Sequence, residues 1–150
     1  MSSIIESAVR AMNDAAERLM LAPDDGYRPF VAVGEALWWI ALVNELLDDA
    51  IGQDPYIADR EPDPDLGRYF LAFEYVRNRF VHDGDVLEHV EPGAPDAQAY
   101  WRWLEQPPGI SKRGRPGERE YRELLAGRTV RATLTDYLAV LRTQAVAYYS

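Results

Sequence analysis

The chain has 150 residues, enough for one domain with a sizeable core, and 47% of them are hydrophobic, which excludes a disordered chain. It contains no cysteine, which excludes a disulfide framework and a thiolate metal site. The formal net charge of −9 argues against a surface that binds nucleic acid through general positive charge.

The start of the chain lacks the basic segment and apolar run of a secretory signal. The longest purely apolar run covers residues 36–43 and is too short to cross a bilayer. We therefore expect a soluble, cytoplasmic protein with no membrane partner.

Two long helices are predicted in the first third of the chain. Residues 3–21 carry apolar side chains at three- and four-residue spacing, and Ser3 and Glu6 have the spacing of a capping box. Residues 30–51 are apolar almost all round. This pattern is typical of a central helix, or of one that also contacts a second subunit.

Four side chains of the second helix stand out. Trp38 and Trp39 are adjacent and so point about 100° apart, which predicts one in the core and the other at a groove or an interface. Glu35 and Asn44 are the polar exceptions, and both are expected on the helix surface.

A third helix is predicted over residues 65–82, with Asp65 as its cap. Its apolar face is formed by Tyr69, Phe70, Phe73, Val76 and Phe80. Gly84 ends this helix, and residues 85–89 are expected to form a short turn.

The remaining elements are shorter. Asp96 can cap a short helix that contains Tyr100–Trp103, and residues 107–117 form a loop rich in proline and glycine. A helix is predicted over residues 118–126, and the last one begins near Thr133. No convincing strand is visible, so the sequence predicts a single all-α domain spanning the whole chain, a bundle of about five helices.

Positive charge is concentrated late in the chain. Residues 110–131 hold seven basic and three acidic residues, whereas residues 44–65 hold eight acidic residues and one basic residue. Lys112, Arg113 and Arg115 lie in the predicted loop and are candidates for contacts to an RNA backbone. A solvated loop explains them equally well.

The third predicted helix ends in a small polar set, Arg77, Asn78 and His82. An arginine holds two phosphate oxygens in fork geometry, and a histidine takes or gives a proton near neutral pH. Together they suit chemistry on a phosphodiester. The set resembles the signature of the HEPN superfamily of small helical domains, in which an arginine and a polar residue precede a histidine by four to six residues.

The resemblance implies a HEPN-like bundle that cleaves RNA through its own 2′-hydroxyl, without a metal or a cofactor. It implies Arg77 and His82 as catalytic residues with Asn78 assisting, in a toxin or antiviral defence effector that an antitoxin or another regulatory protein can control. It also implies a homodimer through the second and third helices. On a continuous helix Arg77 and His82 point about 140° apart, so either the helix ends between them or a second subunit completes the site.

Three alternatives concern the same regions. The chain can be a non-catalytic helical module that binds protein or RNA, with Arg77 paired to an acid such as Glu35 and with His82 capping its helix. The run from His82 to His89 offers metal ligands if both histidines lie on one helix, but we expect no metal site because acidic runs are usually solvated. The aromatic residues of Tyr100–Trp103 can stack RNA bases or anchor a short helix on the bundle.

Overall fold

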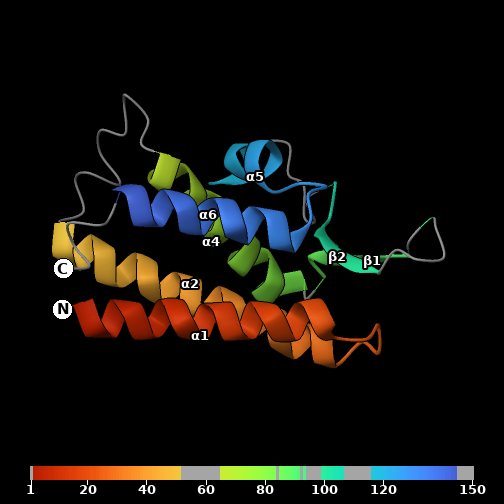
Figure 1. Ribbon diagram of the computed structural model, residues 1–150. Helices are drawn as coiled ribbons and strands as arrows, with labels where there is room; N and C mark the ends of the chain where they lie inside the picture. The colour runs from red at the N-terminus through yellow and green to blue at the C-terminus, as the bar shows by residue number, and fades with distance from the viewer. Residues whose placement is uncertain are drawn as a thin grey trace.

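The computed structural model describes residues 2–51, 65–83, 85–91, 93, 99–106 and 116–144. Within these residues the chain forms five helices and one two-stranded sheet (Figure 1). In chain order they are α1 (Ser2–Leu21), α2 (Arg28–Ile51), α4 (Asp65–Asp83), β1 (Leu87–Val90), β2 (Tyr100–Trp103), α5 (Glu118–Leu124) and α6 (Val130–Gln144). The predicted all-α bundle of about five helices is confirmed.

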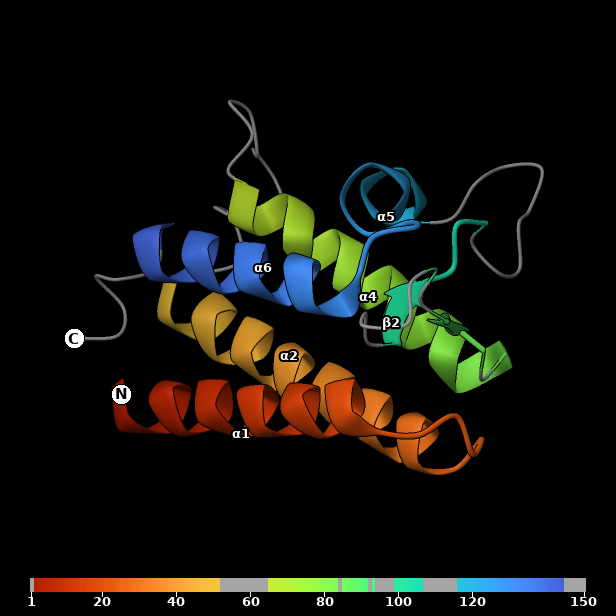
Figure 2. The ribbon, with the colours of Figure 1, turned by 45° about the vertical axis from the view of Figure 1, so that its right-hand side comes forward.

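Four long helices form the bundle. α1 and α2 lie side by side, α2 packs against α4, and α6 contacts both α1 and α4 (Figures 1 and 2). The short α5 packs on α4, away from α1 and α2, and the β1–β2 hairpin lies at one end of the bundle. One cluster of buried hydrophobic side chains extends from Ile5 in α1 to Leu141 in α6.

Helices α1 and α2 form as predicted, with small shifts at their ends. The inward side of α1 is buried and consists of Ile5, Ala8, Met12, Ala15, Ala16 and Leu19. α2 begins two residues before its predicted start because the Asp25 carboxylate accepts hydrogen bonds from the backbone N–H groups of Tyr27 (3.0 Å) and Arg28 (2.8 Å). These hydrogen bonds, the one from Arg28 first, lower the pKa of Asp25.

Helix α2 is the centre of the bundle. Residues 28–47 are long and apolar enough to cross a membrane by length and composition alone. A core helix passes the same test, and α2 packs against α1 on one side and α4 on another. Trp39 packs partly buried against the core, whereas Trp38 is 61% exposed. The prediction that the two tryptophans differ in this way is confirmed.

The expectation that the chain contains no strand is wrong. Residues 87–90 and 100–103 pair in an antiparallel hairpin, with Leu87 opposite Trp103 and Val90 opposite Tyr100. Trp101 and Trp103 are buried, whereas Tyr100, the first residue of β2, is exposed. This two-residue alternation is that of a strand with one buried face, so the predicted short helix over Tyr100–Trp103 and the turn at 85–89 are both replaced by the hairpin.

The last two helices are confirmed, but their boundaries differ from the prediction. α5 ends two residues before its predicted end. α6 begins at Val130 rather than Thr133, because the hydroxyl of Thr129 accepts a hydrogen bond from the backbone N–H of Ala132 (3.0 Å). The residue that caps α6 is therefore Thr129.

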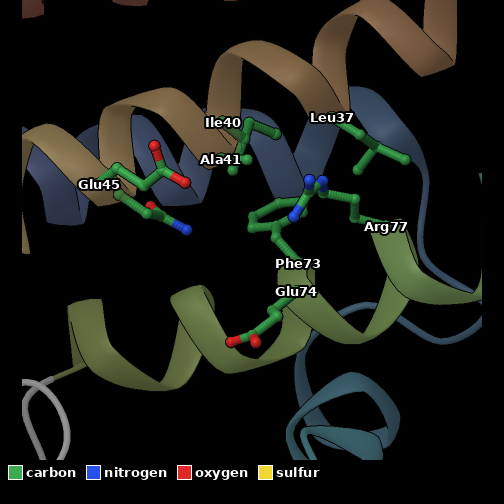
Figure 3. Close-up of a pocket in the computed structure, with 8 residues that line it drawn as sticks. Leu37, Ile40, Ala41, Glu45, Phe73, Glu74 and Arg77 are labelled. Atoms are coloured by element: carbon green, nitrogen blue, oxygen red, sulfur yellow. The ribbon is translucent and has the colours of Figure 1, made fainter.

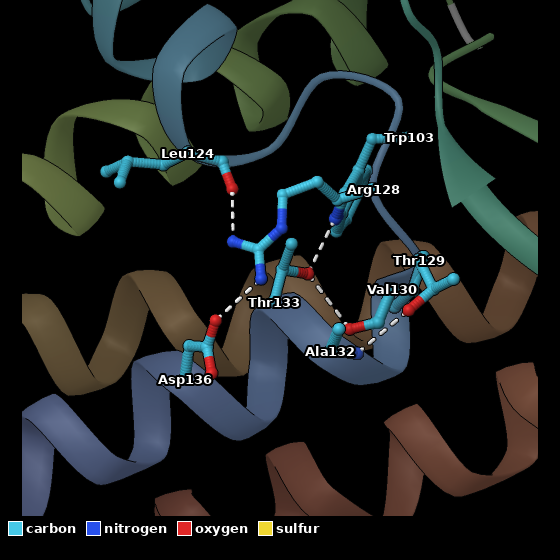
Figure 4. A network of polar contacts seen from close by, with 8 residues as sticks. All are labelled: Trp103, Leu124, Arg128, Thr129, Val130, Ala132, Thr133 and Asp136. Carbon is cyan, nitrogen blue, oxygen red and sulfur yellow. Dashed lines mark hydrogen bonds and ion pairs between the residues drawn. The ribbon is translucent and has the colours of Figure 1, made fainter.

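Thr133 has a different role, inside the corner where the hairpin, α5 and α6 meet. Its buried hydroxyl accepts a hydrogen bond from the indole N–H of Trp103 (2.8 Å) and donates one to the carbonyl of Val130 (2.9 Å) (Figure 4). Trp103 is thereby fixed against α6. The two buried tryptophans of β2 thus anchor a hairpin on the bundle, and not the short helix that the sequence predicted.

Arg128 closes the same corner. It donates hydrogen bonds to the carbonyl of Leu124 at the end of α5 (3.0 Å) and to the carboxylate of Asp136 in α6 (2.6 Å) (Figure 4). The hydrogen bond that Arg128 donates to Asp136 raises the pKa of Arg128, so the guanidinium is held as a cation. The corner therefore joins three elements through polar groups that all have partners.

Candidate functional site

The three motif residues lie on one unbroken helix. Arg77, Asn78 and His82 are all inside α4, which continues to Asp83. At 100° per residue, Arg77 and His82 therefore point about 140° apart. The helix does not end between them, so within one chain the two side chains do not share a face.

Arg77 faces the groove between α2 and α4. It lines a pocket of about 180 Å³ whose wall is completed by Leu37, Ile40, Ala41, Asn44, Glu45, Phe73 and Glu74. Figure 3 shows the guanidinium reaching from α4 toward α2, over the ring of Phe73. The pocket thus combines an apolar base with one cation, one amide and two carboxylates.

The guanidinium of Arg77 forms no ion pair with any residue that the structure describes. Its expected partner, Glu35, instead pairs with Arg18 of α1, and that hydrogen bond raises the pKa of Arg18. The alternative in which Glu35 neutralises Arg77 is therefore wrong, because α2 turns Glu35 toward α1. Arg77 is half-buried and remains open to the pocket.

Asn78 and His82 are exposed on the outer side of α4. His82 lies in the last turn of the helix, as the capping alternative requires, but it forms no hydrogen bond with a described residue. Asn78 and His82 are four positions apart and so share one face, with Asn78 between Arg77 and His82 around the helix. The structure therefore places Asn78 and His82 on one exposed face of α4, while Arg77 points into the groove away from both.

Exposed apolar side chains flank this polar set. Trp38 of α2 is 61% exposed and Val81 of α4 is 69% exposed. Phe30 is 49% exposed and packs on Phe80, with ring centroids 5.0 Å apart, where α2 begins and α4 ends. Trp38 lines a groove between α1 and α2 together with Arg18 and Glu35. The exposed apolar side chains of the α2–α4 face are therefore Phe30 and Val81.

Three polar residues that line the groove were not predicted from the sequence as site residues. Asn44 was expected on the surface, but its side-chain oxygen accepts a hydrogen bond from the hydroxyl of Tyr137 in α6 (3.1 Å). Glu45 and Glu74 line the Arg77 pocket. Glu74 could have been predicted as a site residue because it lies one helical turn before Arg77. Asn44 and Glu45 could have been predicted from their position directly after the apolar run of α2.

Other candidate residues lie elsewhere. His89 is in β1, with its ring centroid 4.7 Å from that of Trp101, so it does not share a helix with His82 and the metal alternative built on that arrangement is wrong. No group of three or more His, Asp or Glu side chains able to hold a metal is present among the described residues. Lys112, Arg113 and Arg115 lie outside the described residues.

Comparisons with known proteins do not identify a family for this chain. No protein-family model matches the chain, and neither curated proteins nor solved structures yield a match.

Proposed function

We propose that this chain is a HEPN-like endoribonuclease of the cytoplasm that cleaves RNA without a metal or a cofactor. Arg77 and His82 are its catalytic residues, and Asn78 assists them. The observation that carries the proposal is that Arg77 forms no ion pair with a described residue and opens on a pocket, while Asn78 and His82 are exposed on the same helix. A half-buried arginine that lines a pocket and has no ion-pair partner in the described part of the chain is suited to an anionic ligand.

Cleavage of RNA needs two proton transfers and a group that stabilises the negative charge on the phosphate. The 2′-hydroxyl of RNA forms a bond to the adjacent phosphorus and loses its proton to a base. The bond from phosphorus to the 5′ oxygen then breaks, and an acid protonates that oxygen, leaving a 2′,3′-cyclic phosphate and a 5′-hydroxyl. Imidazole serves as base or acid near neutral pH, and Arg77 holds the non-bridging oxygens by two parallel hydrogen bonds.

A homodimer through the α2–α4 face supplies the second histidine that one chain lacks at its site. In an in-line attack the 2′ oxygen and the leaving 5′ oxygen lie on opposite sides of the phosphorus, so the base and the acid are best supplied by two separate groups. His82 also points away from Arg77 of its own chain. A second copy would bring its own His82 and Arg77 to a shared cleft. The exposed Phe30 and Val81 give this face an apolar surface to bury in such a contact.

The test is cleavage of single-stranded RNA in the presence of EDTA. We expect the wild-type protein to cut, and His82→Ala and Arg77→Met each to lower the rate at least about 100-fold, the scale of general acid–base and electrostatic terms. Arg142→Met, which changes an exposed arginine in the last turn of α6, is the matched control and should retain full activity. Undiminished cutting by both site variants, with circular dichroism unchanged, would remove the assignment.

A toxin or antiviral defence effector is the biological role that we propose, with RNA as its substrate and an antitoxin or other regulatory protein as its possible partner. Contacts of Lys112, Arg113 and Arg115 to the RNA backbone stay a prediction. The salt dependence of RNA binding measures them, since each lost phosphate contact lowers the slope of affinity against salt by about 0.7 on single strands.

The second candidate function is a non-catalytic interaction domain. The 61% exposure of Trp38 in the groove between α1 and α2 favours it, because a large aromatic side chain in contact with solvent is typical of a binding surface. This candidate predicts no cleavage, and loss of partner binding in Trp38→Ala.

A further inference from the structure

The side chain of Asn44 connects the groove to the core of the bundle. It lines the Arg77 pocket from α2, and its oxygen accepts a hydrogen bond from the hydroxyl of Tyr137 in α6 (3.1 Å). Tyr137 is buried, and its ring packs on Phe73, with centroids 5.1 Å apart, and on Tyr69, with centroids 5.9 Å apart. The tyrosine hydroxyl is therefore fixed by packing, and it fixes the orientation of the amide.

This hydrogen bond decides which end of the amide is left to the pocket. An asparagine side chain has an acceptor oxygen and an NH₂ group with two donor hydrogens. The oxygen of Asn44 is bonded to Tyr137 in the core, and its NH₂ group forms no hydrogen bond with a described residue. Asn44 therefore offers N–H donors to the same pocket that receives the guanidinium of Arg77.

The direction of the two helices turns Asn44 and Arg77 toward each other. α2 and α4 run antiparallel, since Phe30 near the start of α2 packs on Phe80 near the end of α4. Side chains of a helix lean toward its N-terminus. Arg77 therefore leans toward the first half of α4, beside which Asn44 lies, and Asn44 leans toward the first half of α2. Figure 3 shows the guanidinium above the ring of Phe73, one turn before Arg77 on α4.

The two carboxylates of the pocket lie nearer to solvent than these donors. Glu45 and Glu74 are exposed, whereas Asn44 and Arg77 are half-buried. Exposed charges are surrounded by water and screened by salt, so they act weakly on a group that is held deeper in the pocket. An anion that enters the pocket therefore meets the donors at its inner end and the carboxylates at its rim.

We propose that Asn44 is a second phosphate-binding residue of this site and that Tyr137 is its positioning residue, an inference that rests on the proposed function. Arg77 holds the two non-bridging oxygens in fork geometry, and the NH₂ group of Asn44 donates a further hydrogen bond to one of them. Negative charge grows on these oxygens while the 2′-hydroxyl attacks. Tyr137 holds the amide in place before RNA binds, so the donor needs no reorientation during the reaction.

The experiment measures binding apart from cleavage. A short fluorescent single-stranded RNA is titrated with the His82→Ala protein, alone and combined with each further substitution. We expect Asn44→Ala to weaken binding about tenfold, the scale of one hydrogen bond to a charged group. Tyr137→Phe should weaken it by roughly two- to fivefold, the cost of ordering a side chain that is no longer held. Asn13→Ala changes another half-buried asparagine, in the groove between α1 and α6, and should leave the affinity unchanged.

A double-mutant cycle tests whether Asn44 and Arg77 hold the same phosphate. In the Arg77→Met protein, Asn44→Ala should weaken binding by less than about twofold, because the phosphate that both residues hold is no longer bound there. An equal loss with and without Arg77 would overturn the proposal, since the asparagine would then act on the fold and not on that phosphate. Asn44→Asp keeps an acceptor for Tyr137 if the alanine variant does not fold, and wild-type affinity in Asn44→Asp would also overturn it.

The outcomes separate this inference from the proposed function. Cutting of RNA by the wild-type protein, with unchanged affinity in Asn44→Ala, would overturn the role of Asn44 and leave the nuclease standing. Coupled binding by Asn44 and Arg77 without any cutting would overturn the cleavage proposal and leave the two residues as a phosphate site of an RNA-binding protein. No binding of RNA by the wild-type protein would overturn both.

Discussion

The groove between α2 and α4 and the corner where the hairpin, α5 and α6 meet hold polar side chains in opposite ways. In the corner, Arg128 hydrogen-bonds both Leu124 and Asp136, and Thr133 is bonded on both sides. In the groove, Arg77 has no ion-pair partner among the described residues, and the two carboxylates that line the pocket form no ion pair with it. Both regions belong to one small bundle, so the contrast does not come from a difference in fold class.

The contrast separates polar groups that stabilise the fold from polar groups that are available to a ligand. A buried polar group without a partner costs about 1–3 kcal/mol, so a corner that is fully bonded contributes to the stability of the folded state. A half-buried guanidinium that has no ion-pair partner among the described residues contributes little to that stability and is open to an anion. Substitutions in the corner should therefore lower the free energy of unfolding, whereas those in the groove should alter function alone.

The largest effect is expected where α5 begins against α4. Gly117 has φ 83°, and a Cβ atom there would lie 2.2 Å from the carbonyl oxygen of Leu71 and 3.0 Å from Cβ of Tyr75. Gly117→Ala therefore combines a left-handed backbone with a clash against main chain, and we expect a loss of more than about 3 kcal/mol in the free energy of unfolding. Urea unfolding followed by circular dichroism measures it.

Gly26→Ala is the control for that substitution. Gly26 has nearly the same φ, 78°, but no atom lies within 4 Å of its added Cβ. It should cost only about 1 kcal/mol, the price of the left-handed conformation alone. If the two alanine variants lose equal stability, the close packing of α5 on α4 does not hold that side of the molecule together.

A smaller loss is expected at Thr133. Thr133→Val keeps the side-chain volume but removes the acceptor for the indole N–H of Trp103, which is buried. We expect a loss of about 1–3 kcal/mol in thermal or urea unfolding. Thr143→Val is the matched change at an exposed position of α6 and should cost less than about 0.5 kcal/mol. If Thr133→Val and Thr143→Val lose equally little stability, the hydrogen bond between Trp103 and Thr133 does not stabilise the corner. The contrast with the groove would then fail.

The sequence was sufficient for the long helices and insufficient for the corner. Long apolar stripes such as that of α1 repeat over several turns, so their period identifies them with little help from the rest of the chain. The four residues of β2 are too few to show a period, and their aromatic side chains suit a buried strand or a helix anchor alike. Only the pairing with β1 decides between the two.

The cap of α6 could not be predicted for a similar reason. Thr129 and Thr133 both precede apolar residues, and either can cap a helix. Trp103, thirty residues earlier, takes the hydroxyl of Thr133. A contact at that separation is a result of tertiary packing, so the local pattern cannot choose between the two threonines.

The candidate site was predictable as a set of residues but not as an arrangement. The spacing of Arg77, Asn78 and His82 identified the motif, and their positions on one helix fixed the 140° angle. Which cation pairs with Glu35 depends on how α1 packs on α2, and that packing assigns Arg18 to it. The catalytic role of the motif stays a prediction.

The smallest effects give the sharpest test, because they compare two arginines of the same protein. Arg128→Met removes hydrogen bonds to Leu124 and Asp136, and we expect a loss of about 1 kcal/mol in the free energy of unfolding. Arg77→Met keeps the aliphatic stem and loses no ion pair with a described residue, so its stability should lie within about 0.5 kcal/mol of the wild type. Parallel urea titrations at low salt measure both. A loss at Arg77 as large as that at Arg128 would show that its guanidinium serves the fold, and the groove would then offer no free cation to RNA.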